Sequence, residues 1–393
     1  MKLKSLLKIL IVPLLLFADM TSVHAMDSDP SVTEGLYSDY AILLDAQTNQ
    51  VISERGADER IYPASMTKMM TAIVAIESVS DLYQTVTITD EMLDGLYEMN
   101  ASVAGFMTGD SPTVLDLLYG VALPSGADAC HALAYYISGS EESFVRLMNQ
   151  KAAELGMANT SFMNTSGLDD ENHYTTVREM AVLLQYCIQN ETFCDIFSTA
   201  SYVTSPLASY PGGMPMSSTI WSTVDSYGYY MPGFIGGKTG FTYIAGHCLA
   251  YWAELNGMKL IGVTAHADTG MYEPSHIDDA STVLVRMENW QRSVLLEKDQ
   301  VIHTVTVHHK KSDETIEVRA PLTEVLDIPA DESVQMNCTI PAEVNAGLHE
   351  EKLYGNFSIT QGDRVLYSED LAVVIPREKS GFARFVLWLR SIF

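Results

Sequence analysis

The chain has 393 residues, of which 23 are lysine or arginine and 50 are aspartate or glutamate, so its net charge is −27. This length allows two domains, and 47% hydrophobic with 19% charged residues is typical of a folded protein rather than a disordered one. The strong negative charge argues against nucleic acid as a partner, and against adhesion of the body of the protein to anionic lipid.

The first 25 residues have the composition of a secretory signal peptide. Three lysines lie within the first eight residues, a short apolar run follows over 9–17, and Ala25 ends a small-x-small cleavage site. We expect cleavage after Ala25 and an exported protein. The alternative is an uncleaved N-terminal anchor, although the apolar run is short for a transmembrane helix.

The chain has five cysteines, and no pair of them has the spacing of a zinc site. Cys130, Cys187 and Cys248 lie in apolar surroundings, which favours buried free thiols over disulfides. We therefore predict a protein that uses neither a metal nor another cofactor.

Hydrophobic periodicity divides the next part of the chain into strands and helices. Apolar segments on both sides of a polar turn at 45–50 predict a hairpin, and helical spacing dominates from 67 to 190. Within that stretch we expect helices over 114–121, 129–136, 142–155 and 177–188. Residues 198–236 are rich in Ser, Tyr, Gly and Pro, and the Pro-Gly pairs at 211–212 and 232–233 break regular structure.

Strand patterns return over 247–254 and 260–265, and Asn256-Gly257 between them is a strong hairpin signal. A helical pattern follows over 278–290. From 296 to 375 short segments alternate with period two between polar turns, which predicts a small all-β domain. This domain shows no catalytic constellation, so we interpret it as a spacer or docking module.

The last segment, 376–393, predicts an amphipathic helix. Phe382, Phe385, Leu389 and Phe393 fall on one helical face, and basic residues precede and flank it. The segment is too short and too charged to span a bilayer, but its pattern favours a helix that lies in the membrane surface. The alternative is a helix that packs on the all-β domain.

Ser65 and Lys68 lie three residues apart at the start of a helical pattern. Residues at this spacing share a helix face, so Lys68 reaches the Ser65 hydroxyl. A lysine kept neutral by burial can accept the serine proton, and the helix N-terminus supplies N–H groups for an oxyanion. The alternative is a capping serine with a surface lysine, and Ser5 and Lys8 show that the spacing also occurs by chance.

Two further segments place polar side chains beside glycines. Ser125 lies in a tight turn between two apolar helices, which is also where an ordinary helix connection would lie. The stretch 234–242 leads toward a strand; its glycines let a substrate backbone lie close, and Lys238 and Thr239 suit a carboxylate. The alternative for this stretch is a glycine-rich turn with a surface lysine.

The order Ser-x-x-Lys, Ser-Gly-x, Lys-Thr-Gly resembles that of the penicillin-recognising serine enzymes. In detail the chain is similar to the D-alanyl-D-alanine carboxypeptidases, the low-molecular-mass penicillin-binding proteins. The similarity covers roughly residues 38 to 290 and is carried by the segments 63–71, 116–126, 164–176 and 237–248.

The resemblance implies an α+β fold with three parts after the signal peptide of residues 1–25. Residues 26–295 would form a β-lactamase/transpeptidase-like domain, with an antiparallel sheet between helices and an inserted helical subdomain. The all-β domain would follow over 296–375, and the amphipathic helix over 376–393. The implied substrate is the peptidoglycan stem pentapeptide, with β-lactam antibiotics as inhibitors, and residues 377–393 would hold the enzyme on the outer face of the cytoplasmic membrane.

The resemblance also implies roles for individual residues. The nucleophile, the general base and the proton-relay serine would be Ser65, Lys68 and Ser125. The residues that bind the substrate would be Lys238, Thr239, Gly240 and Phe241. The backbone N–H groups of Ser65 and Phe241 would form the oxyanion hole.

One position departs from the family pattern. Ala127 stands where the family usually has Asn, and Asp128 follows where the family commonly has Asp. Loss of the amide removes about 1–3 kcal/mol of hydrogen bonding where nothing compensates. A β-lactamase-type hydrolase, a non-catalytic wall-peptide or penicillin-binding protein, and a transpeptidase therefore stand as alternatives to a carboxypeptidase.

Overall fold

The computed structural model describes residues 28–267, 270, 273–310 and 313–378. The predicted signal peptide and the part of the predicted tail helix beyond residue 378 lie outside this range. The chain forms two compact units, which we describe separately. The larger unit comprises 28–300 and 319–333, and the smaller one comprises 301–318 and the residues from 334 onward.

A five-stranded antiparallel sheet forms the centre of the larger unit, with the order β2-β1-β7-β6-β5. Its strands are β1 (Tyr40–Asp45), β2 (Val51–Arg55), β5 (Phe234–Thr242), β6 (Gly246–Leu255) and β7 (Met258–Ala267). The predicted hairpins are present: β1 leads directly into β2, and β6 leads into β7. Asn256 and Gly257 connect the second pair with positive φ angles of 51° and 79°, as their sequence signal requires.

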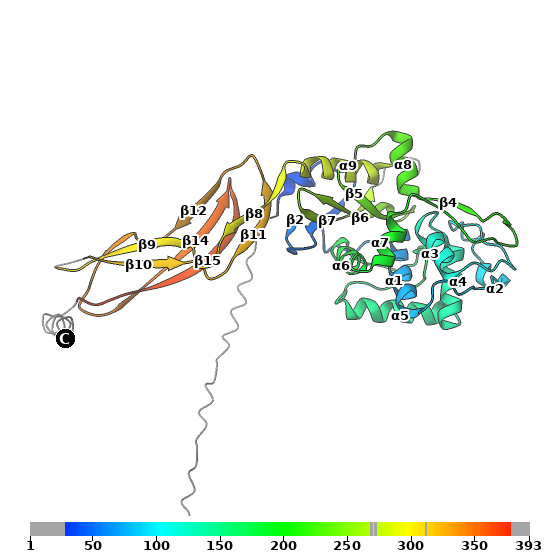
Figure 1. The fold of residues 1–393 in the computed structure, drawn as a ribbon, viewed down its shortest axis with the longest axis horizontal. Helices are drawn as coiled ribbons and strands as arrows, with labels where there is room; N and C mark the ends of the chain where they lie inside the picture. Colours follow the sequence, from blue (N-terminus) through cyan, green and yellow to red (C-terminus); the bar gives the residue numbers. More distant parts are fainter. Residues whose placement is uncertain (1–27, 268–269, 271–272, 311–312, 379–393) are drawn as a thin grey trace, which may run out of the picture. The chain divides into compact units, whose positions relative to one another are not determined.

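Successive side chains of each central strand enter two different hydrophobic cores. Ile42 and Leu44 of β1 belong to one core, whereas Ala41 and Leu43 belong to the other. Because side chains alternate across a strand, this division means that both faces of the sheet are covered. Helices α8 and α9 lie over one face and helices such as α1 and α6 over the other, so the predicted antiparallel sheet between helices is confirmed (Figure 1).

The helices mostly begin at side chains that cap them. Thr113, Ser140 and Thr176 each accept a backbone N–H in the first turn of α3, α5 and α6. The helices are α1 (Lys68–Ser78), α2 (Asp90–Leu93), α3 (Val114–Ala122), α4 (Ala127–Ser138), α5 (Glu141–Glu154), α6 (Val177–Cys187), α7 (Glu191–Ser198), α8 (Thr219–Tyr227) and α9 (Ser275–Met287). Short 3-10 helices, η1 (Pro30–Val32) and η2 (Ala64–Thr67), precede β1 and α1.

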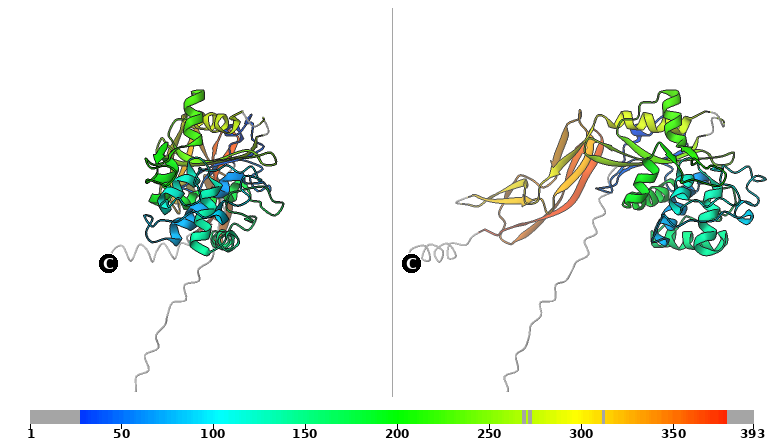
Figure 2. Two further views of the ribbon diagram at one scale, coloured as in Figure 1. Left: turned by 90° about the vertical axis from the view of Figure 1, so that its right-hand side faces the viewer. Right: turned by 45° about the vertical axis from the view of Figure 1, so that its right-hand side comes forward.

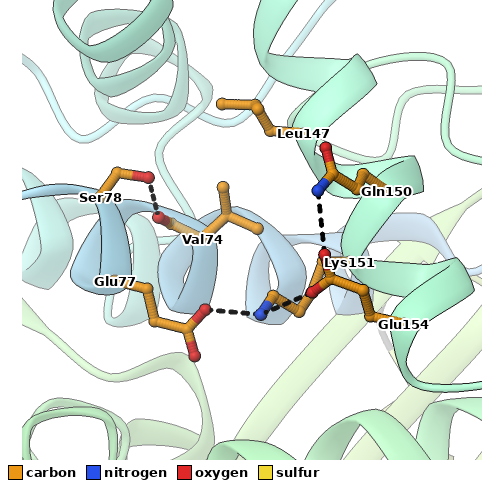
Figure 3. Close-up of a pocket in the computed structure, with 7 residues that line it drawn as sticks. All are labelled: Val74, Glu77, Ser78, Leu147, Gln150, Lys151 and Glu154. Carbon is orange, nitrogen blue, oxygen red and sulfur yellow. Dashed lines mark hydrogen bonds and ion pairs between the residues drawn. The ribbon is translucent and has the colours of Figure 1, made fainter.

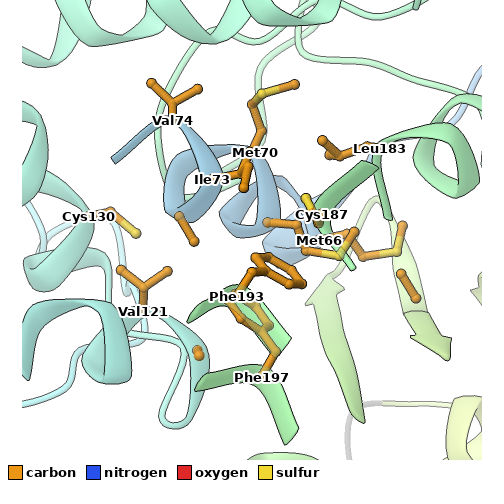
Figure 4. Packing of buried hydrophobic residues seen from close by; sticks show 14 of the residues in the cluster. Met66, Met70, Ile73, Val74, Val121, Cys130, Leu183, Cys187, Phe193 and Phe197 are labelled. Carbon is orange, nitrogen blue, oxygen red and sulfur yellow. The ribbon is translucent and has the colours of Figure 1, made fainter. Parts of the chain in front are cut away.

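Helix α1 is the central element of the larger core. Met66, Met70 and Ile73 are fully buried, and they pack among side chains from α3, α4, α6 and α7 (Figure 4). On α7, Phe193 and Phe197 stack with ring centroids 4.1 Å apart (Figure 4). The buried apolar side chains of the helical pattern predicted after Ser65 therefore fix the helix whose N-terminal end presents the candidate nucleophile.

Three local details differ from the sequence expectations. The helix expected at Ser65 starts as the 3-10 turn η2, and α1 begins only at Lys68. Helix α8 forms within the Ser- and Gly-rich stretch because Ser218 caps it and Gly228 ends it in a left-handed conformation. Trp290 starts a strand, β8 (Trp290–Leu296), instead of ending α9.

Strand β8 pairs with β11 (Glu324–Pro329), which returns from the C-terminal part of the sequence into the larger unit. The Gln50 side chain donates to the Asp327 carbonyl at 2.8 Å and accepts from the Asp327 N–H at 2.7 Å. Arg292 pairs with both Asp45 and Asp327, two carboxylates that are 0% exposed. A buried polar clasp, defined by these four residues, thus joins β8 and β11 to β1 and the turn that follows it.

The smaller unit contains only strands among its described residues, as the sequence predicted. They form the three-stranded sheets β10-β9-β13 and β12-β14-β15, whose long hairpin is drawn in orange and red in the two views of Figure 2. The bounds are β9 (Val301–His308), β10 (Asp313–Arg319), β12 (Val334–Cys338), β13 (Glu343–Asn345), β14 (Glu351–Gln361) and β15 (Arg364–Ile375). Val305, Val307, Ile340, Val373 and Ile375 form its core.

A last pair of short strands, β3 (Ser201–Val203) and β4 (Pro215–Ser217), lies in the larger unit before α8. Across the described ranges, the structure contains no helix that is long and apolar enough to cross a bilayer.

Candidate active site

Ser65 and Lys68 are held together by the 3-10 turn that contains the serine. Because a 3-10 helix has three residues per turn, side chains at i and i+3 lie directly above one another. The Lys68 Nζ donates to the Ser65 Oγ over 2.8 Å. The predicted contact is therefore present. The 3-10 turn aligns the two side chains along the helix axis more closely than an α-helix would.

Lys68 is buried, and among the described residues no carboxylate forms an ion pair with it. Its side chain, in a residue only 2% exposed, donates to the Ser65 Oγ and to the Ser166 carbonyl oxygen, the latter at 2.7 Å. Burial lowers the pKa of Lys68 below its ordinary value, because the charged form loses its hydration. A neutral amine beside a hydroxyl can take the serine proton, which is what a nucleophilic serine requires.

The loop of residues 164–168 supplies the carbonyl that holds Lys68. Asn164 Oδ1 accepts the backbone N–H groups of the following residues, including Gly167 at 2.7 Å. Glu141 Oε1 accepts both the N–H and the hydroxyl of Thr165, at 2.8 and 2.7 Å, and the Thr71 hydroxyl of α1 donates to the Thr165 carbonyl at 2.6 Å. The sequence singled out this loop by resemblance, but it assigned no role to Ser166 or Glu141.

The same loop passes so close to the nucleophile that one of its positions requires glycine. A Cβ atom on Gly167, whose φ is +85°, would lie 1.8 Å from the Ala64 carbonyl oxygen. Ala64 itself has a φ of 46°, a left-handed conformation that is uncommon for a residue with a side chain. The backbone on both sides of this contact is therefore tightly constrained beside Ser65.

Ser125 occupies the turn between α3 and α4, as expected, again with a left-handed φ of 63°. Its hydroxyl is buried, and no described residue makes a hydrogen bond to it. Since buried hydroxyls normally have partners, this one is available for a substrate or for a proton in transit.

Ala127 and Asp128, the first residues of α4, shape the wall beside this serine. Ala127 lines the pocket described below, and its N–H donates to the Ser102 carbonyl at 2.7 Å. The Asp128 carboxylate accepts the backbone N–H groups of Ala104, Gly105 and Phe106 at 2.7 to 3.0 Å. The acid that follows the altered position therefore orders the loop around residues 100–106.

The third motif lies on β5, the edge strand of the sheet, rather than before a strand. Lys238 is 1% exposed, and its Nζ donates to the Thr239 carbonyl at 2.9 Å. Burial and then the positive charge of Lys68 lower the pKa of Lys238 well below its ordinary value. A Cβ on Gly240 would lie 3.1 Å from the Ser65 backbone nitrogen, so this strand runs directly beside Ser65.

These elements enclose a pocket of about 510 Å³. It is lined by Ser65, Lys68, Met99, Asn100, Ala101, Ser102, Ala127, Ser166, Gly167, Leu168, Asp169, Phe241, Thr242 and Tyr243. Of the predicted site residues, the nucleophile, the base and Phe241 line the pocket directly. The remaining predicted residues lie in the Ser125 turn and on the strand that ends in the pocket wall. Within the described ranges, no three His, Cys, Asp or Glu side chains gather as a metal site would require.

Comparison with known proteins agrees with this geometry. The family model described as D-alanyl-D-alanine carboxypeptidase matches residues 26–269. D-alanyl-D-alanine carboxypeptidase DacF of Bacillus subtilis is 27% identical over 394 residues, which cover 98% of this chain and 97% of the relative. The D-alanyl-D-alanine carboxypeptidase of Streptomyces sp. (strain K15) is 34% identical over 244 residues, which cover 60% of this chain and 82% of that one.

Solved structures show the same fold. The crystal structure of the Streptomyces K15 DD-transpeptidase superposes with a TM-score of 0.57 at 29% identity, covering 64% of this chain and 96% of that one. Penicillin binding protein 5 from Haemophilus influenzae has a TM-score of 0.61 at 24% identity, covering 87% of this chain and 97% of the other, a similarity of fold.

Proposed function

Since the chain belongs to the D-alanyl-D-alanine carboxypeptidase family, we propose that Ser65 is the nucleophile with which it removes the terminal D-alanine from peptidoglycan pentapeptides. The chain is a serine hydrolase of the cell wall and a penicillin-binding protein. Its family favours this activity over a β-lactamase-type hydrolase or a non-catalytic binding protein. The observation that carries the assignment of Ser65 is its 2.8 Å contact with the buried Lys68 amine.

In the proposed mechanism, Lys68 in its neutral form accepts the hydroxyl proton as the Ser65 Oγ attacks the carbonyl carbon between the two D-alanines. The backbone N–H groups of Ser65 and Phe241 stabilise the oxyanion. This is supported by the closeness of Gly240 to the Ser65 nitrogen, which brings the next residue of β5 beside it. Collapse of the tetrahedral intermediate breaks the C–N bond and leaves an acyl-enzyme on Ser65.

The leaving amine needs a proton, which we assign to a relay through Ser125 with Lys238. The buried hydroxyl of Ser125 has no partner among the described residues and is free to act in this way. Thr239 and Lys238 receive the terminal carboxylate of the substrate. Water then attacks the acyl-enzyme, releases the tetrapeptide and returns the proton to the Ser65 Oγ.

Mass spectrometry of a pentapeptide incubated with the enzyme tests the proposal. We expect a product lighter by one D-alanine, with free D-alanine in equal amount. A cross-linked product would instead indicate transpeptidation. Rapid turnover of penicillin without D-alanine release would overturn the carboxypeptidase assignment, and a bound but uncleaved peptide would indicate a non-catalytic protein.

We further propose export through residues 1–25 and attachment of the enzyme to the outer face of the cytoplasmic membrane through residues 377–393. The support is the sequence: a basic and apolar N-terminus before a cleavage site, and a basic amphipathic C-terminus on an acidic protein. The domain ranges 26–295, 296–375 and 376–393 belong to the same proposal. Deleting the residues after Pro376 should move the enzyme from the membrane fraction to the soluble fraction, and continued retention would contradict the anchor.

A further inference from the structure

Asp169 has a distinctive position in the catalytic pocket. Among the residues that line it, only Lys68 and Asp169 carry a charged side chain. Lys68 lies beside the nucleophile, whereas Asp169 is exposed and belongs to the loop that follows Ser166. Asp169 Oδ1 accepts a hydrogen bond from the Thr242 hydroxyl at 2.7 Å, at the end of β5, which fixes the carboxylate on the pocket wall.

The direction of β5 sets the order of the subsites along a bound peptide. Ser65 lies beside Gly240, while Lys238 precedes Gly240 by two residues and Thr242 follows it by two. A strand advances by about 3.4 Å per residue, so Lys238 and Thr242 lie about 7 Å to either side of the reaction centre. A peptide whose terminal carboxylate binds at Lys238 and Thr239 therefore extends its acyl part toward Thr242 and Asp169.

The length of an extended peptide then identifies which residue faces Asp169. Such a peptide advances by about 3.3–3.6 Å per residue. With the scissile carbonyl beside Ser65, the third residue from the C-terminus reaches about the level of Thr242. Its side chain, rather than either D-alanine, is the part of the substrate that lies within reach of Asp169.

The remaining wall of this part of the pocket indicates the chemistry of that side chain. Leu168 and Phe241, the chain neighbours of Asp169 and Thr242, offer apolar surface in the pocket, and Tyr243, which is 82% exposed, follows Thr242 in the chain. Apolar surface favours an aliphatic chain, whereas a carboxylate with an exposed aromatic ring favours a cation. Both requirements are met by a long aliphatic side chain that ends in a protonated amine.

We propose that Asp169 and Tyr243 form a subsite for the third residue from the C-terminus of the substrate peptide. The subsite would bind a protonated amine at the end of that residue's aliphatic side chain. The inference rests on the proposed function, because it takes the orientation of the peptide from the roles of Ser65 and Lys238. It assigns to Asp169 a part in substrate selection, separate from the bond-breaking steps.

The test compares two peptides on the full-length enzyme: Nα-acetyl-L-Lys-D-Ala-D-Ala, which has a free side-chain amine, and its Nα,Nε-diacetyl form. We expect kcat/KM for D-alanine release to be about two- to fivefold higher with the free amine, and the ratio to shrink at high salt. Asp169→Asn should bring the ratio close to one, because asparagine still accepts the Thr242 hydrogen bond but carries no charge.

Glu171→Gln is the matched control. It removes an equal charge two residues after Asp169, from a side chain that does not line the pocket. This variant should keep the wild-type ratio. Acylation by benzylpenicillin, which has no side-chain amine, should also be unchanged in Glu171→Gln, and it is measured in Asp169→Asn for comparison.

Three results would overturn the subsite: no preference in the wild type, a preference that survives in Asp169→Asn, or an equal loss with both peptides and with penicillin, which would make Asp169 a purely structural residue. A wild-type enzyme that releases D-alanine from neither peptide would contradict the proposed function instead.

Discussion

A lysine side chain lies at each end of helix α1, one from the helix itself and one from the neighbouring helix α5. The two lysines have opposite environments. At the N-terminal end, Lys68 contacts a hydroxyl and a carbonyl but no carboxylate, and burial lowers its pKa. Near the C-terminal end, Lys151 of α5 pairs with Glu77 at 2.9 Å and with Glu154 at 3.1 Å (Figure 3). The hydrogen bond that Lys151 donates to Glu77 raises the pKa of Lys151 more strongly than partial burial lowers it.

The comparison shows that partners, more than residue type, determine what a lysine can do. Both lysines lie at pockets, since Val74, Glu77, Lys151 and their neighbours line a cavity of about 170 Å³ (Figure 3). The pair of carboxylates keeps Lys151 protonated, so it is a structural cation. Lys68 lacks such partners and gains a neutral form that can act as a base. The following experiments use the two ends of α1 as each other's control.

The largest effect is expected from Ser65→Ala. Removing the nucleophile should lower D-alanine release by at least about 10³-fold and abolish covalent labelling by penicillin. Both can be measured by product analysis and by gel fluorescence with a labelled penicillin. Ser78→Ala at the other end of α1, whose hydroxyl only donates to the Val74 carbonyl, should leave both unchanged. Persistent labelling of Ser65→Ala would contradict the assignment.

The second largest effect is expected from Lys68→Arg, with a loss of about 10²–10⁴-fold in acylation rate. A guanidinium stays protonated at all working pH values, so it cannot accept the serine proton. In the wild type, acylation should rise with pH through the lowered pKa of Lys68 and level off below the ordinary lysine range. That rise should disappear in the variant. Lys151→Arg is the control with no expected effect, and an unchanged rise in Lys68→Arg would rule out Lys68 as the base.

A smaller effect is expected at Glu141, which acts on Lys68 through the loop of residues 164–168. Glu141→Ala leaves the Thr165 N–H without its acceptor, which should cost about 1–3 kcal/mol of unfolding free energy. We also expect about a tenfold loss in kcat/KM as the Ser166 carbonyl shifts. Urea unfolding and D-alanine release measure the two effects. Glu142→Ala, on an exposed neighbour, should change neither by a comparable amount.

Glu141 also gives the stability a pH dependence. Burial raises its pKa, but hydrogen bonds and the charge of His131, together with the hydrogen bonds from Thr165, outweigh burial and lower the pKa to about 2. Since the unfolded value is about 4.5, the carboxylate stabilises the fold above that pH, and this contribution is lost as the pH falls toward 2. The difference in unfolding free energy between wild type and Glu141→Gln should therefore shrink on acidification, and a constant difference would contradict the shift.

The smallest effect is expected from Lys151→Met. The pairs with Glu77 and Glu154 are partly exposed, so their loss should cost less than about 1 kcal/mol of unfolding free energy. Catalysis should be unchanged, which distinguishes the structural lysine from the catalytic one. A large loss of activity would show that the two ends of α1 are coupled, and would contradict a purely structural role for Lys151.

The sequence predicted the elements whose patterns are local. The apolar stripe of α1 and the Asn256-Gly257 turn specify their own conformations, and both are present. The contact between Ser65 and Lys68 was also predictable, because a spacing of three residues brings side chains together in either kind of helix turn. The family resemblance added the α+β architecture, which no single segment specifies.

Features that depend on distant segments could not be predicted in this way. The Ser166 carbonyl reaches Lys68 only because Glu141 and Thr71 hold its loop from two other helices. No periodicity in residues 164–168 signals such a role. Likewise, the sequence placed the segment around Lys238 before a strand, whereas in the structure the segment is itself the edge strand β5. Helix α8 was missed for a different reason, because the composition of residues 198–236 was given more weight than the local signals of Ser218 and Gly228.

The polar clasp of Gln50, Asp45, Arg292 and Asp327 limits where this protein can be truncated. Within the described residues, the chain passes between the two units at 300–301, 318–319 and 333–334. A fragment that ends at residue 300 would lose β11, leaving β8 as an open edge and Arg292 with half of its carboxylate partners. Open edges recruit other chains, so such a fragment should aggregate. A shortened protein must keep residues 319–333, through a linker or a circular permutation, so that β11 still pairs with β8. Simple truncation at residue 300 removes this pairing.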